Sequence, residues 1–323
     1  MPIREEFNPA AAGKKRIVFF LKLLFSLTLI GFLLAVKASP RDILGVLAGV
    51  DIGLLGIALS LHAVGLLVSA YRWQILARAQ GDDIPLGVLV KSYLVGTFFS
   101  QFLPSSFGGD AVRIWDGSKY SRSLARSSAV VIVERLTGIA VLFGFAFLAS
   151  LLRLDMAAEL PVIWVSLVLG FFGLAAVTVF FLPLAERLRE GFPGRLLPSK
   201  IRIGIGEFRR SVLHYKTQPR PFLRALIWAF VLQINVVVFF YLIGLAFRLD
   251  IAFLDYFIFI PIVLLIQIIP VTINGLGLRE GSYIQIFAFY GISPHTAFSF
   301  SIVDVGFRLL LGLAGGVLFA VRK

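Results

Sequence analysis

Cysteine is absent from the 323-residue sequence, and histidine occurs only at His62, His214 and His295. Without cysteine the chain forms no disulfide, no iron–sulfur cluster and no thiol nucleophile. The three histidines lie far apart in the sequence, and no group of His, Asp and Glu has the spacing of metal ligands. The sequence therefore argues against a metalloenzyme, and we expect no cofactor.

Charged residues are scarce as well, at 15% of the chain, whereas 59% of the residues are hydrophobic and the mean hydropathy is +0.92. These values lie outside the range of soluble globular domains and indicate an all-α, polytopic membrane protein. The net charge of +13 does not require a nucleic-acid partner, because basic residues concentrate in the cytoplasmic loops of membrane proteins.

Six apolar runs are long enough to cross about 30 Å of hydrocarbon. They are residues 17–36, 52–71, 129–152, 161–183, 222–246 and 294–321. Two further runs, 86–104 and 251–270, end in loops with proline and glycine. The first run follows basic residues and has an alternative interpretation as a secretory signal, but its length favours an uncleaved span.

The distribution of basic residues indicates that one run does not cross the membrane. If every run crossed, the loop 184–221 with its nine Lys and Arg residues would lie outside, against the positive-inside rule. If 86–104 dips into the membrane and 105–128 returns, the basic segments all lie inside. We therefore predict a multi-pass protein of the bacterial inner (cytoplasmic) membrane with a cytoplasmic N-terminus and a re-entrant element.

The second half of the chain repeats the same pattern. Residues 101–113 read QFLPSSFGGDAVR and residues 267–280 read QIIPVTINGLGLRE, and each stretch is followed by a run with an acid and an arginine. We predict two re-entrant elements in an inverted repeat, as in many transporters, with chance similarity as the alternative. The pseudo-repeats are approximately 52–183 and 222–321, joined by the basic cytoplasmic loop 184–221, within a single transmembrane domain 1–323.

The two glycine-rich stretches are candidate binding sites for an anion. Proline and glycine interrupt a helix there, so that freed backbone amides could hold a phosphate and Arg113 could clamp it with two hydrogen bonds. The alternative is a plain interfacial loop capped by Asp110. The candidate substrate-binding residues are Gln101, Pro104, Ser105, Ser106, Gly108, Gly109, Asp110, Arg113, Glu134, Arg135, Gln267, Asn274, Gly275, Gly277, Arg279, Glu280, Asp304 and Arg308.

Charged residues inside the apolar runs should face the protein interior and pair with each other, because insertion into hydrocarbon costs at least ~2.5 kcal/mol each. Glu134 with Arg135 and Asp304 with Arg308 are such pairs. Coupling to substrate or protons and a purely structural ion pair are both open for them. The segment Tyr71 to Trp73 is interpreted first as an interfacial anchor and second as a headgroup contact.

Four motifs together resemble a known family. The motifs are YRWQIL (71–76), FLPSSFGGDAVRIW (102–115), VVIVERLTG (130–138) and INGLGLREGSYIQIFAFYGIS (273–293). They resemble the flippase-like membrane region of the lysylphosphatidylglycerol synthase family. The resemblance implies a region that moves a lipid between leaflets, and it points to residues 101–113, Glu134, Arg135 and 274–283. In two-part members a soluble domain transfers lysine from aminoacyl-tRNA to phosphatidylglycerol, and we expect that domain to be missing here.

Three functions remain in view at this stage. The first is a lipid transporter or flippase that binds an anionic headgroup, from a phospholipid or a polyprenyl-phosphate carrier, between the two inverted motifs. The second is an intramembrane enzyme that acts on a lipid phosphate, although no nucleophile–base pair is visible. The third is a non-catalytic membrane partner of an envelope glycosyltransferase. We favour the first, with membrane lipids as partners and no enzymatic activity; the oligomeric state stays open.

Overall fold

The computed structural model describes residues 9–102, 108–181, 199–269 and 271–322, which form helices joined by short connections and no strand. The helices are α1 (Pro9–Val36), α2 (Pro40–Ala48), α3 (Ile52–Ala79), α4 (Leu86–Phe102), α5 (Gly108–Ser121), α6 (Leu124–Leu152), the 3₁₀ helix η1 (Leu154–Met156), α7 (Val162–Phe181), α9 (Ser199–Thr217), α10 (Pro219–Ala246), α11 (Phe253–Ile268), α12 (Leu278–Ala288) and α13 (Pro294–Ala320). The predicted all-α class is confirmed.

Four of the described helices, α3, α6, α10 and α13, are long and apolar enough to cross a membrane. A fifth candidate is the pair α1–α2, which bends by 80°. The bend falls at Pro40, which begins α2 after a residue with extended backbone. The predicted span 161–183 corresponds to α7, whose stretch Val162–Thr178 is apolar but shorter. The described residues thus show a multi-pass protein with four to five candidate spans.

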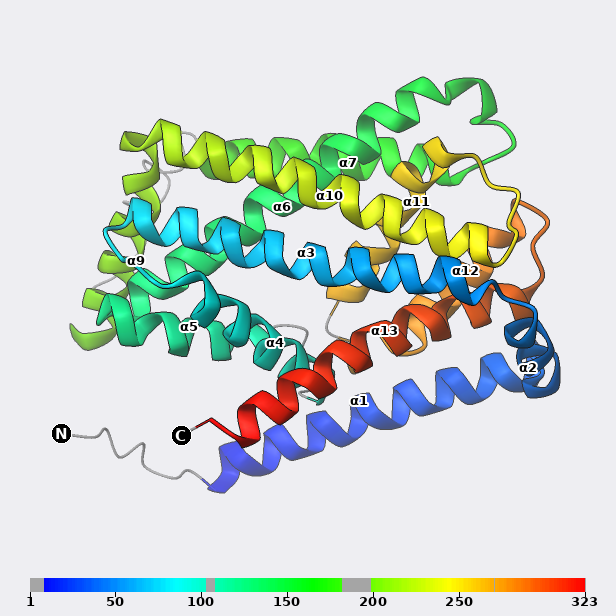
Figure 1. The fold of residues 1–323 in the computed structure, drawn as a ribbon, viewed down its shortest axis with the longest axis horizontal. Coiled ribbons are helices and arrows are strands. Elements are labelled where there is room, and N and C mark those ends of the chain that lie inside the picture. Colours follow the sequence, from blue (N-terminus) through cyan, green and yellow to red (C-terminus); the bar gives the residue numbers. More distant parts are fainter. Residues whose placement is uncertain (1–8, 103–107, 182–198, 270, 323) are drawn as a thin grey trace.

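The long helices run side by side, and the start of α1 and the end of α13 lie at the end of the bundle that carries α9 (Figure 1). Helix α3 packs antiparallel to α10. At one end the amide of Asp51 donates to the carbonyl of Ala246 over 3.1 Å, and toward the other end Arg72 Nε donates to the carbonyl of Ala225 over 3.4 Å. The largest core lies among α10 to α13, where Phe259 and other aromatic side chains are fully buried.

Two pairs of shorter helices each begin and end at one end of the bundle. Helix α4 follows the turn after α3, and α5 leads into α6, where Arg126 pairs with Asp82 of that turn at 3.3 Å. Small residues let α4 and α5 approach closely, since a Cβ on Gly109 would lie 2.3 Å from the Gly96 carbonyl oxygen. The pair α11–α12 begins after α10 and leads into α13 in the same manner at the opposite end.

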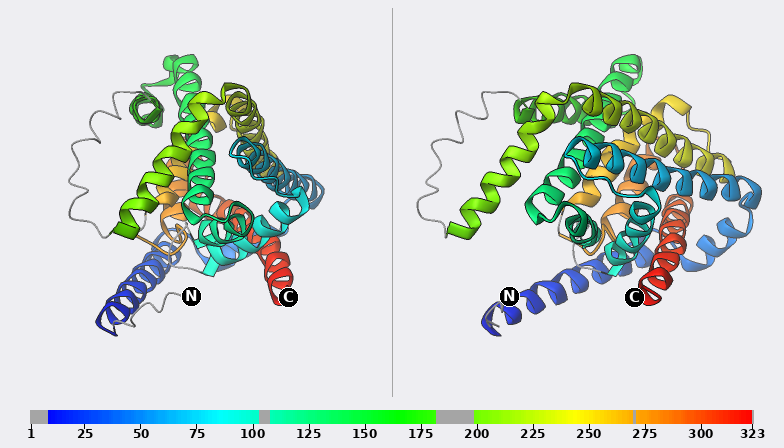
Figure 2. Two further views of the ribbon diagram at one scale, coloured as in Figure 1. Left: turned by 90° about the vertical axis from the view of Figure 1, so that its left-hand side faces the viewer. Right: turned by 60° about the vertical axis from the view of Figure 1, so that its left-hand side comes forward.

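Helix α9 crosses the end of the bundle beside α6 (Figure 2). Tyr215 donates from its hydroxyl to the carbonyl of Leu76 over 2.9 Å, and Gln80 donates to the carbonyl of Ser211 over 2.6 Å. These contacts fix α9 to the last turn of α3.

Helix α1 lies along the edge of the bundle (Figure 1) and contacts the turn between α11 and α12. The hydroxyl of Ser26 accepts a hydrogen bond from the amide of Ile273 over 3.1 Å. A Cβ on Gly277 would lie 2.8 Å from a methyl group of Leu29. Gly277 has φ of +85°, so a side chain there would be strained as well as crowded.

An ion pair joins the far end of α6 to the start of α11. Arg153 contacts Asp255 with two hydrogen bonds of 2.8 and 3.2 Å, and Asp255 is buried. We expect Arg153→Ala to lower the free energy of unfolding by roughly 1.5–3 kcal/mol, because the buried carboxylate loses charge-assisted hydrogen bonds. Thermal unfolding in detergent measures this effect. Arg41→Ala, at an exposed position of α2, is the matched control, and equal stability of the two variants would contradict the prediction.

Candidate functional site

The ends of the two short-helix pairs meet inside the bundle. Asn274, in the turn before α12, donates from its side-chain amide to the side-chain oxygen of Gln101 near the end of α4 over 2.6 Å. Asn274 has φ of +51° and the following Gly275 has φ of +73°, so this turn uses the left-handed backbone that asparagine and glycine tolerate best. The structure thereby brings the two predicted motifs into direct contact.

A cavity of about 280 Å³, which we call the polar cavity, opens beside this contact. Side chains from both halves of the chain line it, including those of α4, α5, α6, α11 and α13. The lining residues are Tyr93, Gly96, Thr97, Ser100, Gln101, Gly109, Asp110, Arg113, Arg135, Leu264, Gln267, Ile268, Asn274 and Arg308. Eight of the predicted substrate-binding residues are therefore gathered around one cavity: Gln101, Gly109, Asp110, Arg113, Arg135, Gln267, Asn274 and Arg308.

Arg113 is the most enclosed of the arginines that line the polar cavity, with 5% of its surface exposed. Its guanidinium lies 3.8 Å from the ring centre of Tyr93 and 4.7 Å from that of Trp73, within the range of cation–π attraction. It pairs with Glu134 and, over 3.3 Å, with Asp110. Its Nε is buried without a hydrogen-bond partner among the described residues, so one donor of the guanidinium is uncommitted.

Glu134 lies behind Arg113 and joins it to a second buried arginine. Arg72 approaches the Glu134 carboxylate to 4.0 Å and donates to the Glu134 carbonyl and to the Thr137 hydroxyl, each over 2.9 Å. The hydroxyl of Tyr93 also donates to the Glu134 carboxylate. One carboxylate thus faces two arginines, and burial makes each of these contacts costly to break.

Arg135, next in sequence to Glu134, pairs with Asp110 instead of with its neighbour. Asp110 therefore contacts both Arg113 and Arg135 at the first turn of α5. An acid in that position is favoured by the helix dipole. The amide of Gly109, predicted to be available for an anion, donates to the hydroxyl of Ser100 over 3.1 Å.

Arg308 supplies the cation from the second half of the chain. It contacts Asp304 with two hydrogen bonds of 3.1 and 2.8 Å and donates to the side-chain oxygen of Gln267 over 2.8 Å. The ion pair predicted from the four-residue spacing of Asp304 and Arg308 is confirmed. Asp304 is fully buried behind Arg308, as Glu134 is behind Arg113.

The charges at the polar cavity do not balance. The participating groups are the arginines Arg72, Arg113, Arg135 and Arg308 and the acids Asp110, Glu134 and Asp304. With all of them ionised, four positive charges less three negative ones leave a surplus of one positive charge. Electrostatic attraction is stronger where bulk water is excluded, so the surplus positive charge favours an anionic ligand.

Other predicted residues lie apart from the polar cavity. Arg279 is 1% exposed and donates to Glu280 over 2.6 Å and to Ser301 over 2.9 Å. The second Glu280 oxygen accepts from the amide of Gly277 over 2.6 Å and so caps α12. Gly108 is buried at the start of α5, while Pro104, Ser105 and Ser106 lie outside the described residues.

Sequence reasoning missed Tyr93, and it interpreted Arg72 and Trp73 first as an interfacial anchor and only second as a headgroup contact. Arg72 and Trp73 are buried, because α3 continues to Ala79 and keeps them inside the bundle, whereas Tyr71 is partly exposed beside Trp228. Tyr93 lies in the middle of α4. The signal for Arg72 was an arginine within an apolar helix, which more often faces an interior site than a lipid surface.

A charged cavity between paired short helices, inside a bundle of apolar spans, defines a multi-pass membrane protein with an interior polar site. Residues 19–316 match the family described as the lysylphosphatidylglycerol synthase TM region, and the chain belongs to this family. It is also similar to the UPF0104 membrane protein of Methanothermobacter thermautotrophicus, with 26% identity over 287 residues that cover 82% of this chain and 84% of the relative. Among the described residues, no group of three or more His, Asp or Glu side chains is placed to hold a metal ion.

Proposed function

We propose that this protein is a lipid transporter of the flippase type that binds the anionic headgroup of its substrate in the polar cavity. The observation that carries the proposal is the surplus positive charge at a cavity built from both motifs. A phosphate, on a phospholipid or on a polyprenyl carrier, matches this site because arginine forks recognise phosphate oxygens in pairs. The buried, uncommitted Nε of Arg113 adds a donor for the same ligand.

We infer that the two halves form an inverted repeat, which supports transport through this cavity. Helices α3 to α6 have 28, 17, 14 and 29 residues, and α10 to α13 have 28, 16, 11 and 27. The equivalent helices α3 and α10 pack antiparallel, as an axis in the membrane plane requires. We infer that α4–α5 and α11–α12 are re-entrant elements that enter from opposite sides and meet near the midplane.

The orientation that we propose places α9 and both chain termini in the cytoplasm. The start of α1, the end of α13 and the turns before α4 and α6 share that end of the bundle, and the basic residues of the sequence concentrate in the same segments. Arg113 pairs with Glu134, and Arg308 pairs with Asp304. As the two halves move, each arginine would then exchange its carboxylate for the lipid headgroup. We therefore propose that the polar cavity serves transport and not catalysis.

A reversible cross-link between the two motifs tests the proposal. In this cysteine-free chain, Gln101→Cys and Asn274→Cys place thiols at two positions whose side chains are hydrogen-bonded to each other in the native protein. We expect a short bis-methanethiosulfonate cross-linker, which joins the two thiols through disulfides that a reductant cleaves, to reduce translocation of fluorescent phosphatidylglycerol in proteoliposomes to background, because the motifs must separate. Cleavage of the linker should restore the initial rate.

Each single-cysteine variant, treated with the same reagent, is the control. Translocation of phosphatidylcholine in the same vesicles reports on headgroup selectivity. An unmodified protein that moves neither phosphatidylglycerol nor a polyprenyl phosphate, or a cross-linked protein that moves them at the original rate, would contradict the proposal.

A further inference from the structure

A pocket of about 250 Å³, which we call the side pocket, adjoins the polar cavity. Helices α3, α4, α10 and α13 form its walls. Its polar lining residues are His62, Ser69, Tyr93, Thr97 and Asn235, and the remainder of its lining is apolar. Tyr93 and Thr97, one turn apart on α4, line both spaces, so a ligand in the polar cavity reaches the side pocket past these two residues.

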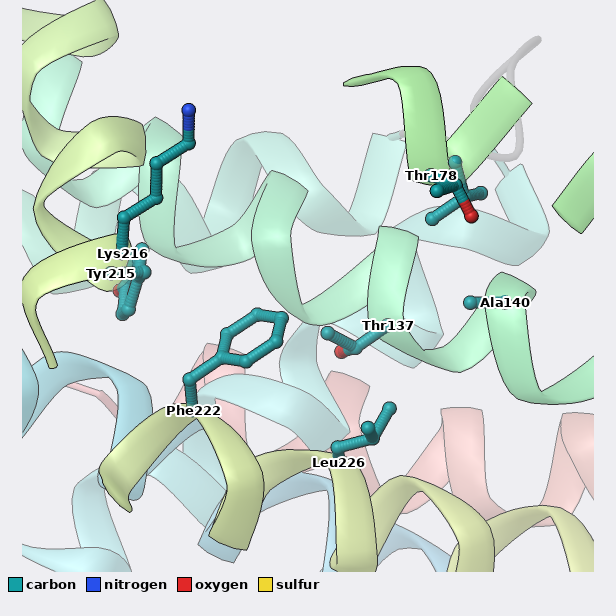
Figure 3. A pocket seen from close by; sticks show the side chains of 8 residues that line it. Thr137, Ala140, Thr178, Tyr215, Lys216, Phe222 and Leu226 are labelled. Carbon is teal, nitrogen blue, oxygen red and sulfur yellow. The ribbon is translucent and has the colours of Figure 1, made fainter. Parts of the chain in front are cut away.

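Uncommitted polar side chains distinguish the side pocket from the larger hollow between α6, α7 and α10. That hollow, of about 390 Å³, is bordered mainly by hydrocarbon, such as the side chains of Phe222 and Leu226 (Figure 3). In the side pocket, by contrast, neither His62 nor Asn235 makes a hydrogen bond with a described residue. The ring of His62 contacts only the ring of Phe239, with 5.0 Å between the two ring centres.

The depth of these two side chains in the membrane excludes an apolar occupant. His62 and Asn235 lie well inside α3 and α10, which are both candidate spans. A hydrocarbon chain in the side pocket would leave their hydrogen-bonding atoms without a partner, which is costly away from bulk water. The occupant of the side pocket is therefore a group that forms hydrogen bonds.

The charges around the side pocket exclude an ionic occupant. Among the described residues, no Asp, Glu, Lys or Arg lines this pocket. Asp304 and Arg308 of α13, whose charges reach His62, pair with each other over 2.8 Å. An ammonium group in the pocket would lack a carboxylate and would lie beside the surplus positive charge of the polar cavity, and a second phosphate would lack a guanidinium. The occupant is therefore uncharged.

The hydrogen-bonding groups of the side pocket match hydroxyls. Ser69 and Thr97 donate their hydroxyl hydrogens to the carbonyls four residues earlier in their helices, over 2.9 and 3.0 Å, which leaves their oxygens as acceptors. A neutral histidine ring and an asparagine amide each offer both a donor and an acceptor. A hydroxyl also donates and accepts, so several hydroxyls on one small group satisfy these side chains together. The pocket holds several times the ~30 Å³ that a water molecule takes up in the liquid, which is room for glycerol or one sugar.

We propose that the side pocket binds the polyol of a phosphodiester lipid, glycerol or a sugar, while the phosphate of the same lipid lies in the polar cavity. A phosphodiester carries one negative charge, which equals the surplus positive charge at the polar cavity. The side pocket thereby narrows the substrate class of the proposed function, on which this assignment rests, from anionic lipids to phosphodiester lipids with a polyol headgroup. The ammonium groups of ethanolamine and choline headgroups exclude them from this pocket.

A matched pair of lipids tests this site. Phosphatidylmethanol keeps the phosphodiester and the charge of phosphatidylglycerol but has a methyl group in place of glycerol. Native mass spectrometry of the protein from nanodiscs with equal amounts of the two lipids measures which one stays bound. We expect a preference of roughly fivefold or more for phosphatidylglycerol, because a site built to bond hydroxyls rejects an analogue that lacks them. A polyprenyl-phosphoryl glucose and polyprenyl methyl phosphate form a second pair, which tests a sugar in the same way.

Substitutions in the side pocket should remove the preference without removing the phosphate site. Asn235→Leu keeps the size of the side chain but loses its donor and acceptor, so both lipids of the pair should be retained as native protein retains phosphatidylmethanol. Ser69→Ala should reduce the preference by about threefold, the effect of one hydrogen bond, and it carries the test if Asn235→Leu fails to fold. Ser60→Ala is the matched control and should keep the native preference, because Ser60 makes the same bond within α3 at an exposed position outside the pocket.

Two kinds of failure are distinguishable in this experiment. Equal retention of the two lipids in both pairs, or a preference that Asn235→Leu and Ser69→Ala leave intact, would overturn the polyol site and indicate a side pocket that holds water alone. Native protein that retains none of these anionic lipids above phosphatidylcholine would contradict the proposed function, and the polyol site with it.

Discussion

Arg113→Gln is expected to reduce lipid translocation by roughly ten- to a hundredfold while the helix bundle stays folded. The lost interaction is a charge-assisted contact with the headgroup phosphate, which contributes about 1.5–3 kcal/mol. Folding should survive because Glu134 keeps Arg72 at 4.0 Å and the hydroxyl of Tyr93. The measurement is the initial rate of phosphatidylglycerol translocation in proteoliposomes at equal protein density.

Two further variants separate charge from geometry in that experiment. Arg113→Lys keeps the positive charge but loses the planar fork and the stacking on Trp73, so an intermediate rate is expected. Arg126→Gln removes an arginine that pairs with Asp82 at the end of the bundle, away from the polar cavity, and should leave the rate unchanged. Normal translocation by folded Arg113→Gln protein would rule out the proposed role of this residue.

Glu134→Gln should have the largest effect on stability, a loss of about 3–5 kcal/mol in the free energy of unfolding. Glu134 is 4% exposed and is the carboxylate shared by Arg72 and Arg113, so the substitution removes the charge that pairs with two buried guanidinium groups. Arg113→Gln should destabilise the fold less, because the Glu134 carboxylate then keeps Arg72 as a partner. Thermal or denaturant unfolding in detergent reports the difference.

A second substitution should recover part of that loss. Arg72→Gln in the Glu134→Gln background removes one of the two buried cations that lost their shared carboxylate, so the double variant is expected to be more stable than Glu134→Gln alone. Glu159→Gln makes the same chemical change at an exposed position and serves as the control. If Glu134→Gln and Glu159→Gln unfold at the same temperature, the buried network does not stabilise the fold as described.

The apolar runs predicted most of the helices, because a segment that spans a membrane must be long, apolar and helical. Helix ends were predicted less well. Helix α6 begins at Leu124, five residues before the apolar run, because polar residues of its first turns contact α5 and the turn after α3. The bend at Pro40 was not predicted, since a run of apolar residues does not record the direction of its axis.

The sequence predicted many of the residues at the candidate site, but only some of the ion pairs between them. The pair Asp304–Arg308 lies within one helix, where a four-residue spacing fixes the contact. Glu134 and Arg135 are adjacent and therefore point in different directions, so each pairs with a residue of α5. Which residue that is depends on the rotation of α5 about its axis, and no local pattern contains that angle. The same limit explains why Arg279 pairs with Glu280 away from the polar cavity.

The contact between α1 and the turn before α12 has a consequence for how the protein is made. Ser26 and Ile273 are 247 residues apart in the chain. At about 5–20 residues per second, the ribosome needs roughly 12–50 s to synthesise that interval. During this time α1 is already in the membrane while its docking turn does not yet exist. Helix α1 is therefore inserted well before the turn that it docks against exists, and its lipid-facing surface must hold it in the bilayer until the second half of the chain arrives.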